Sequence, residues 1–186
     1  MTIKTLTLNF GEIEGVKTWP SMQFTDIRGS LFKVVGSKVF QDFHAKEIFF
    51  TSSHENTFRG MHLQIGEHPV NKIVSVLSGS ISDFLVDTRS SSTTFLNVLN
   101  LELNHSDKKV VYIPSGVAHG YLVRESKTTV MYLYDNNFCS DCDAGFNVSS
   151  LPVMNFENTK YIRSERDSLL PSIKEFLVDT LSIEFK

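Results

Sequence analysis

Short apolar segments separated by turn-forming residues dominate the middle of the chain. Residues 72–77 are β-branched and apolar, and the pattern resumes over residues 81–87 after Ser78-Gly79-Ser80. Gly and Ser between two such segments favour a turn, so this stretch predicts a β-hairpin. Farther along, alternate positions share one face of a predicted strand: Phe95, Asn97, Leu99, Leu101 and Leu103.

Three more short strands are predicted over residues 110–113, 121–123 and 128–134. Short strands at regular spacing are typical of β-sandwiches and barrels, so we expect an all-β fold. Helical spacing is confined to the end of the chain, where we expect a helix on the outside of the barrel. Ser172 would cap this helix, and its apolar face would carry Ile173, Phe176, Leu177 and Leu181.

The 186 residues are enough for one domain with a sizeable core, and we expect a single domain over residues 1–186. The net charge of −3, without a basic tract, argues against a general nucleic-acid binder. No apolar run approaches the roughly 20 residues that span a bilayer. The first residues, Met1-Thr2-Ile3-Lys4-Thr5, lack the apolar stretch of a signal peptide. We therefore expect a cytoplasmic protein.

The two cysteines form a single C-x-x-C motif, Cys139-Ser-Asp-Cys142. Such a motif can be redox-active or supply half of a zinc site. Here the sequence contains no second cysteine pair and shows no thioredoxin-like strand and helix around the motif. The sequence therefore favours two loop thiols without a function.

Ionisable residues of three kinds occur among the predicted strands. His62 lies in a segment that begins with Arg59, and Lys72 begins the next strand. Histidine can take a proton near neutral pH, whereas lysine and arginine can hold negative charge on a reacting oxygen or a phosphate. With Tyr132 as a proton donor, these residues suit proton removal next to a carbonyl group. The competing interpretation is a packed or surface histidine, a lysine that shields a strand and a core tyrosine.

A metal is a further possibility for a strand-rich barrel, because such barrels often bind one through a His-x-His motif. The corresponding triplet here is His62-Leu63-Gln64, and glutamine is a poorer ligand for zinc or iron than imidazole. His119 alone cannot complete the site, and Glu67 and His68 are the remaining candidates. The ligand count favours no metal. We expect neither a metal nor another cofactor.

Many stretches in a fixed order match one family. They are Asp26-Ile27-Arg28-Gly29, residues 59–64, Lys72-Ile73-Val74 with Gly79, residues 83–89 with Ser92 and Thr94, residues 113–121, Tyr132, and Ser164-Glu165-Arg166-Asp167 with Pro171. On these stretches the sequence, from about Phe24 to Pro171, resembles the dTDP-4-dehydrorhamnose 3,5-epimerase family, cupin-type enzymes of nucleotide-sugar biosynthesis. The resemblance implies a jelly-roll barrel with a few short peripheral helices, and a homodimer whose subunits exchange N-terminal strands.

The resemblance also implies a role for each matched position. His62 would be the base, and Asp167 would pair with it. Lys72 would stabilise an enolate, and Tyr132 would return a proton on the opposite face of the sugar. Neither a metal nor a nicotinamide is required for this chemistry. The implied substrate-binding residues are Arg28, Arg59, Gln64, His119, Asp143, Arg166 and Ser53.

Several positions depart from the family pattern at places that would touch substrate. Phe138 stands where a second tyrosine is usual, and Asp143 is shorter than the usual Glu. Thr51-Ser52-Ser53 replaces a Gln-Asp-Asn stretch that contacts the base, and Val148-Ser149-Ser150 replaces Trp-x-Asp. Lys33 stands where Glu is usual. We therefore expect the same chemistry on a different nucleotide sugar, or inversion at only one carbon.

These observations predict an isomerase that inverts C3, C5 or both in a nucleotide-linked 4-dehydro-6-deoxyhexose. The product would enter deoxysugar biosynthesis and supply a surface polysaccharide such as an O-antigen. The set of Lys72, Tyr132 and Asp167 resembles the corresponding residues of the epimerases, which favours an epimerase over a ketoisomerase. Three alternatives stay open: a ketoisomerase that moves the carbonyl from C4 to C3, a non-catalytic sugar-binding module, and a metal-dependent oxygenase.

Overall fold

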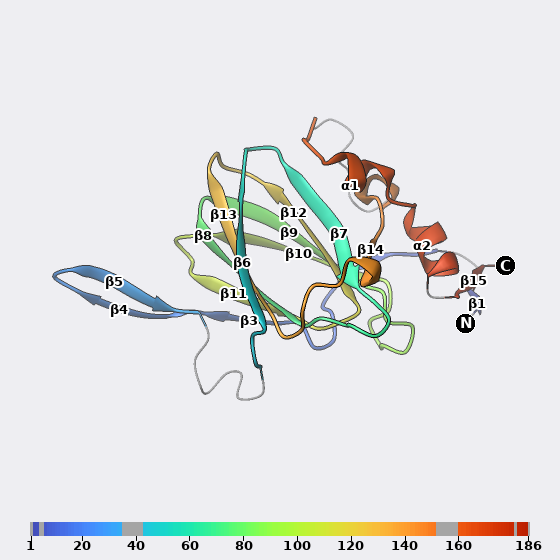
Figure 1. Ribbon diagram of the computed structural model, residues 1–186, viewed down its shortest axis with the longest axis horizontal. Helices are drawn as coiled ribbons and strands as arrows, with labels where there is room; N and C mark the ends of the chain where they lie inside the picture. Colours follow the sequence, from blue (N-terminus) through green and yellow to red (C-terminus); the bar gives the residue numbers. More distant parts are fainter. Residues whose placement is uncertain (1, 4–5, 35–42, 152–159, 181, 186) are drawn as a thin grey trace.

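The computed structural model describes residues 2–3, 6–34, 43–151, 160–180 and 182–185, and strands make up most of the regular structure (Figure 1). The helices in these ranges are short, α1 (Glu165–Leu169) and α2 (Ile173–Asp179), with two 3₁₀ turns, η1 (Ser140–Cys142) and η2 (Val148–Ser150). The strands are β1 (Thr2–Ile3), β2 (Asn9–Phe10), β3 (Lys17–Pro20), β4 (Met22–Asp26), β5 (Gly29–Lys33), β6 (Glu47–Ser53), β7 (Phe58–Gln64), β8 (Lys72–Ser78), β9 (Ser80–Asp87), β10 (Asn97–Asn104), β11 (Lys109–Ile113), β12 (Val117–Val123), β13 (Thr128–Tyr134), β14 (Asp143–Gly145) and β15 (Glu184–Phe185).

Two sheets form the body of the described molecule. A six-stranded sheet has the order β14-β7-β12-β9-β10-β2, and a five-stranded sheet has the order β3-β11-β8-β13-β6. The side chains of strand β12 alternate between the two faces of the six-stranded sheet. Val117, Tyr121 and Val123 join an inner apolar cluster with residues of both sheets, whereas Ala118 and Leu122 join an outer cluster. The all-β jelly-roll prediction is confirmed.

Helix α2 covers the outer face of the six-stranded sheet, as predicted. Ile173, Phe176 and Leu177 are buried in the outer cluster. Ser172 caps the helix in a complete capping box, in which its side chain accepts from the Glu175 amide and Glu175 accepts from the Ser172 amide. Leu181, also predicted for this apolar face, lies outside the described residues.

The strands on either side of Gly79 do not pair with each other, so the predicted hairpin is wrong. Strand β8 pairs with β11 and β13, whereas β9 pairs with β10 and β12 in the other sheet. Gly79 has φ of +76°, and a Cβ at this position would overlap the Thr128 side chain. The turn signal is correct, but the turn is a corner that carries the chain from one sheet to the other.

The two cysteines are also paired, against the expectation of free loop thiols. Cys139 and Cys142 form a disulfide across η1, with their Cα atoms 5.2 Å apart. The tight turn of η1 brings positions i and i+3 together, and this separation suits a disulfide.

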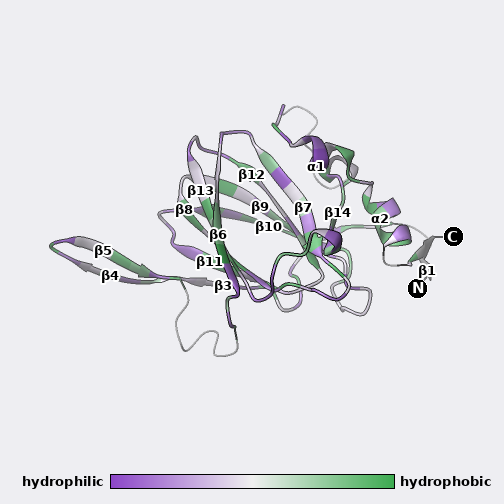
Figure 2. Cartoon of the chain, in the orientation of Figure 1, coloured by the Kyte–Doolittle hydropathy of each residue, from purple (hydrophilic) through white to green (hydrophobic). Residues whose placement is uncertain are grey.

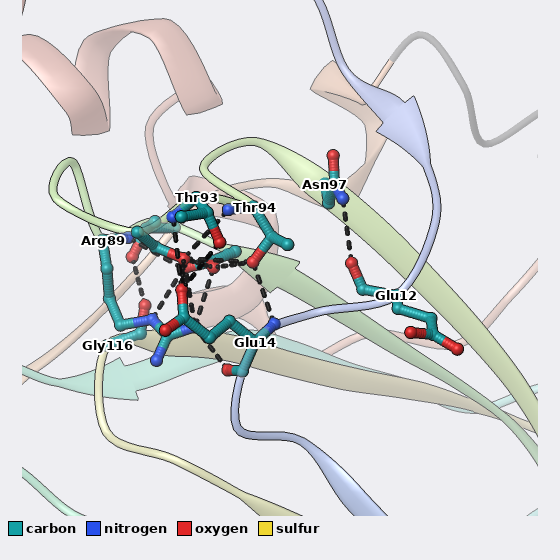
Figure 3. Close-up of polar contacts among 10 residues, drawn as sticks. Glu12, Glu14, Arg89, Thr93, Thr94, Asn97 and Gly116 are labelled. Carbon is teal, nitrogen blue, oxygen red and sulfur yellow. Dashed lines mark hydrogen bonds and ion pairs between the residues drawn. The ribbon is translucent and has the colours of Figure 1, made fainter.

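A polar network fixes the loop after β9 against the N-terminal segment (Figure 3). Asp87 is fully buried and accepts hydrogen bonds from Arg89 Nε at 2.8 Å and Nη2 at 2.7 Å, and from the hydroxyls of Ser92 and Thr94. Arg89 also donates to the backbone carbonyl of Glu14 at 2.7 Å. Burial would raise the pKa of Asp87, but these donors outweigh it and lower the pKa. The matched stretch over residues 87–94 therefore anchors the N-terminal segment to the sandwich.

Within the described ranges, none of the helices is long and apolar enough to cross a membrane.

Candidate active site

Alternation along three strands points the predicted catalytic residues into the barrel. On β7, Met61 and Leu63 belong to the outer cluster, so His62 between them faces inward. On β13, Tyr132 belongs to the inner cluster. Lys72 on β8 shares its face with the inner-cluster residue Val74. The period-two pattern therefore gathers a histidine, a lysine and a tyrosine on inward faces.

Two glycines allow β7 and β12 to approach closely beside His62. A Cβ on Gly60 would lie 2.5 Å from the Gly120 Cα, and a Cβ on Gly120 would lie 2.9 Å from the Arg59 carbonyl oxygen. Real Cβ atoms do not tolerate such contacts. The close approach accompanies a shift in register and leaves His62 opposite His119.

His62 and Asp167 form a hydrogen-bonded pair. His62 Nε2 lies 2.8 Å from Asp167 Oδ1, and the Gly60 amide donates to Asp167 Oδ2 at 3.2 Å. Ser164 caps α1 and accepts from the Asp167 amide at 3.0 Å, which fixes the aspartate on the first turn. Burial would raise the pKa of Asp167, but its hydrogen bond to His62 and the other donors outweigh it and lower the pKa. The carboxylate can thus hold a proton on Nε2 and leave Nδ1 of a neutral imidazole as the acceptor.

Lys72 is buried beside this pair. Its Nζ donates to the His62 carbonyl oxygen at 3.2 Å and lies 5.6 Å from the centre of the Tyr134 ring. Burial lowers the pKa of Lys72 to about 8, although the charges of Asp143 and Asp83 act in the opposite direction. An ammonium group in such dry surroundings interacts strongly with a developing oxyanion.

Tyr132 lines the same cavity as Lys72, and its phenol keeps its proton at neutral pH. Burial, reinforced by Tyr121 and Tyr134, raises the pKa of Tyr132 well above its ordinary value. The Tyr132 ring stacks on Phe49 with centroids 5.0 Å apart. A neutral, fixed phenol is suited to give a proton rather than to take one.

These groups line a cavity of about 600 Å³. Its cationic side chains are Arg59, Lys72, Arg163 and Arg166, whereas Asp167 is the one carboxylate among its described lining residues. An excess of guanidinium groups in a concave site favours an anionic ligand such as a diphosphate. Eight of the predicted site residues line this cavity: Ser53, Arg59, His62, Lys72, His119, Tyr132, Arg166 and Asp167.

A second cavity of about 390 Å³ adjoins the first, since both are lined by Phe49, His62, Lys72 and Tyr134. The second cavity also includes Gln64, Asp143 and Phe138 in its lining. It therefore continues the site beyond the histidine and the lysine, and its described lining residues include no arginine.

Other predicted substrate-binding residues have partners within the protein. Arg166 Nη2 lies 2.7 Å from Asp143 Oδ2, and Arg59 Nε donates to the Ser53 hydroxyl at 3.0 Å. His119 Nε2 lies 2.6 Å from Asp83 Oδ1, and both side chains are buried.

Arg28 is the predicted residue that does not reach the cavity of its own chain. It lies at the tip of the β4–β5 hairpin, which projects away from the sandwich (Figure 1). Its side chain is 86% exposed and ion-paired with Asp26.

Comparison with known proteins decides the family, because the model of the dTDP-4-dehydrorhamnose 3,5-epimerase family matches residues 11–175. The chain belongs to this epimerase family. The dTDP-4-dehydrorhamnose 3,5-epimerase of Escherichia coli (strain K12) is 28% identical over 173 residues, which cover 89% of this chain and 94% of the relative. The Shigella flexneri epimerase is 31% identical over 134 residues, with 69% and 74% coverage.

A solved member of the family has the same fold. The dTDP-4-dehydrorhamnose 3,5-epimerase of Bacillus anthracis, solved with TDP and PPi bound, is 26% identical with a TM-score of 0.82. The match covers 90% of this chain and 99% of the solved chain. The family and the isomerase class predicted from the sequence are therefore confirmed.

The candidate site contains residues that the sequence analysis did not assign. Tyr134 lies two positions after Tyr132 on β13, so period-two spacing alone places it on the same inward face. Arg163 directly precedes the matched segment that begins at Ser164, and it lines the first cavity. His54 and Thr57 also line this cavity, and they lie in a loop that has no pattern to reveal them.

Two departures from the epimerase pattern differ in their surroundings. Phe138 lines the second cavity and is 55% exposed. Because phenylalanine lacks the hydroxyl of the tyrosine usual at this position, the change removes a polar group from the candidate site itself. Val148, by contrast, is fully buried in the outer cluster with α2. The presence of valine instead of tryptophan at position 148 therefore changes the packing of the core.

Proposed function

We propose that this chain inverts C3, C5 or both in a dTDP-linked 4-dehydro-6-deoxyhexose. The observation that carries the proposal is the His62–Asp167 pair on the wall of a cationic cavity that also holds Lys72 and Tyr132. The arginines would bind the diphosphate through charge-assisted hydrogen bonds. The keto sugar would then lie at the boundary of the two cavities, which His62 and Lys72 share.

The proposed reaction moves protons and involves no net oxidation. The C–H bond next to the C4 ketone breaks, and His62 Nδ1 takes the proton while Asp167 balances the imidazolium charge. The electron pair passes to the ketone oxygen, and the Lys72 ammonium stabilises the resulting enolate. Tyr132 then donates its phenolic proton to carbon from the opposite face, and both side chains regain their starting protonation through solvent. Return on the opposite face inverts the carbon.

We also propose that two copies of the chain form a homodimer through the β4–β5 hairpin. Figure 2 shows hydrophobic stretches along this projecting hairpin, and its exposed apolar residues include Phe24 at 54% and Ile27 at full exposure. Strand β6 pairs only with β13 among the described strands, and its outward side chains Ile48 and Phe50 are 67% and 71% exposed. Exposed apolar patches of this kind mark interaction surfaces. A hairpin packed on the partner's β6 would bring Arg28 toward the partner's cavity, since Thr51 and Ser53 of β6 line it.

The test of the proposed function is solvent exchange with a dTDP-4-dehydro-6-deoxyhexose in deuterated water. Mass spectrometry and NMR should find deuterium at C3, C5 or both, together with product of inverted configuration. Product with the carbonyl at C3 would instead identify the ketoisomerase. Binding of the sugar without exchange would leave only a binding module, and absence of exchange with dTDP-, CDP- and GDP-linked keto sugars would refute the proposal.

A further inference from the structure

A second group of reactive side chains lies at the edge of the epimerase site. Cys139 and Cys142 flank η1 between β13 and β14, and His68 lies in the loop between β7 and β8. One ligand atom from each residue lies within 4.8 Å of the other two. The cysteines are partly exposed and His68 is exposed, so solvent, reductants and ions can reach them.

The three donors have the chemistry of a zinc site. Zinc prefers cysteine sulfur at about 2.3 Å and histidine nitrogen at about 2.0–2.1 Å in tetrahedral geometry. Two such ligands on one ion lie roughly 3.5–3.8 Å apart by that geometry. The His68 nitrogen therefore lies within about 1 Å of a ligand's spacing from each sulfur. The two sulfurs, which a disulfide holds about 2.05 Å apart, must separate by roughly 1.7 Å once the bond is reduced. Small rotations of the side chains can supply this difference, and solvent can fill the fourth position.

The two loops are held together independently of the sulfur atoms. The buried Gln64 side chain accepts from the Cys139 amide at 2.9 Å and donates to the His68 carbonyl at 2.8 Å. The Ile65 amide donates to the Cys142 carbonyl at 3.0 Å. Opening the disulfide would thus leave both cysteines and the histidine in place, and the site would be preorganised for an ion.

We propose that His68, Cys139 and Cys142 of the reduced protein bind one zinc ion, and that the disulfide is the alternative state of the same site. Conversion from the disulfide takes two electrons and two protons from a dithiol reductant, which itself becomes a disulfide. Zinc then displaces the two thiol protons and binds both sulfurs as thiolates. The two states exclude each other, because the sulfurs of a disulfide are no longer thiolates.

The position of this site links it to the epimerase pocket. Phe138 directly precedes Cys139 and Asp143 directly follows Cys142, and both line the second cavity with His62 and Lys72. Zinc binding would therefore set the wall of the sugar site. This consequence rests on the proposed function, whereas the binding of zinc does not.

The test uses the full chain without any nucleotide sugar. The protein is reduced with a dithiol, freed of reductant under argon, and titrated with Co²⁺ and then with Zn²⁺. We expect one ion per chain, a thiolate-to-cobalt charge-transfer band, and its loss when zinc displaces cobalt. The oxidised protein should take up no ion.

Variants assign the ligands. Cys142→Ser should abolish the charge-transfer band, and His68→Ala should weaken zinc binding by roughly tenfold or more while keeping both cysteines. His105→Ala, at an exposed histidine in another turn, is the matched control and should bind as wild type does. Circular dichroism would establish that each variant folds. Failure of the reduced protein to bind, or equal binding by the His68 and His105 variants, would overturn the proposal and leave the question of epimerisation untouched.

Discussion

At the scale of single residues, Lys72 carries the clearest electrostatic signature of the site. Burial lowers its pKa to about 8, whereas an unfolded lysine titrates near 10.4. The ammonium form that would stabilise an enolate is therefore lost as the pH rises through about 8. Over the same range, up to about pH 10.4, the unfolded lysine binds more protons than the folded one, so the contribution of Lys72 to folding stability rises with pH.

Activity and the contribution of Lys72 to stability should thus move in opposite directions between about pH 8 and pH 10.4. We expect the alkaline limb of the kcat/KM profile to fall with an apparent pKa of about 8. Lys72→Arg should lose this limb, since a guanidinium stays charged throughout, even if its activity is lower. If kcat/KM of Lys72→Arg still fell at the same pH, the titrating group would be one other than Lys72.

Tyr132 offers a second test at this scale. Its buried, neutral phenol would act after the base, so Tyr132→Phe should slow product formation more than deuterium exchange at the first carbon. Tyr134→Phe is the informative comparison, because Tyr134 lies on the same face and also lines the cavity. Equal loss of exchange and of product in Tyr132→Phe would show that Tyr132 has another role.

The sequence reveals the inward-facing residues better than their partners. His62, Lys72 and Tyr132 are predicted from residue chemistry among short apolar segments, and the structure brings them to one cavity. Asp167 lies 105 positions from His62, so spacing could not choose it, and only the family resemblance supplied it. Arg163 and His54 lie outside regular strands, where no periodicity marks a side chain as inward.

At the scale of elements, the Asp87 network explains why a loop with little apolar content is fixed. Arg89→Met would leave the buried Asp87 carboxylate with two hydroxyl donors and the backbone amide of residue 89, and without its ion pair. We expect the free energy of unfolding in urea to fall by roughly 3 kcal/mol. Arg124→Met removes an exposed arginine and should cost no more than about 1 kcal/mol. Similar losses in both variants would contradict a special role for the buried pair.

The cap of α2 gives a smaller effect in the same assay. Ser172→Ala removes the side chain that accepts from the Glu175 amide, and should cost about 1 kcal/mol of unfolding free energy. Ser91→Ala, in an exposed loop, is the control and should be neutral. A neutral Ser172→Ala would mean that packing alone holds the helix.

Elements were easier to predict than their pairing. The β13 strand was predicted with the bounds that the structure shows, and α2 with its cap. The hairpin around Gly79 was wrong, because Ser-Gly-Ser suits a corner between sheets as well as a turn within one. Strands before residue 72 were not assigned, since charged and polar side chains such as Arg59 interrupt the apolar pattern on strands that line the site.

At the scale of the whole molecule, complementation between two inactive variants can test whether Arg28 of one subunit serves the cavity of its partner. Arg28→Ala and His62→Asn should each be inactive alone if both residues serve the reaction. Mixing them by dilution from urea would form heterodimers. If Arg28 serves the partner's cavity, one site of each heterodimer has both changes and the other site has neither. We expect activity to return on mixing if Arg28 serves the partner's cavity. If each Arg28 served its own chain, the mixture would stay inactive.

The dimer itself should depend on the apolar hairpin. Light scattering should give the mass of two chains for the wild type and a monomer fraction for Phe24→Asp. Phe10→Asp is a matched control, because Phe10 is 63% exposed but lies on β2, away from the hairpin. A monomeric wild type, or equal effects of both variants, would exclude the hairpin as the interface.

The most direct test concerns the base on which the proposed chemistry depends. The exchange of substrate hydrogen for deuterium should be compared in the wild type, His62→Asn and the remote control His105→Asn. We predict that His62→Asn exchanges about 10²- to 10⁴-fold more slowly with its fold intact, whereas His105→Asn matches the wild type. Exchange by His62→Asn at the wild-type rate would contradict the assignment of His62 as the base.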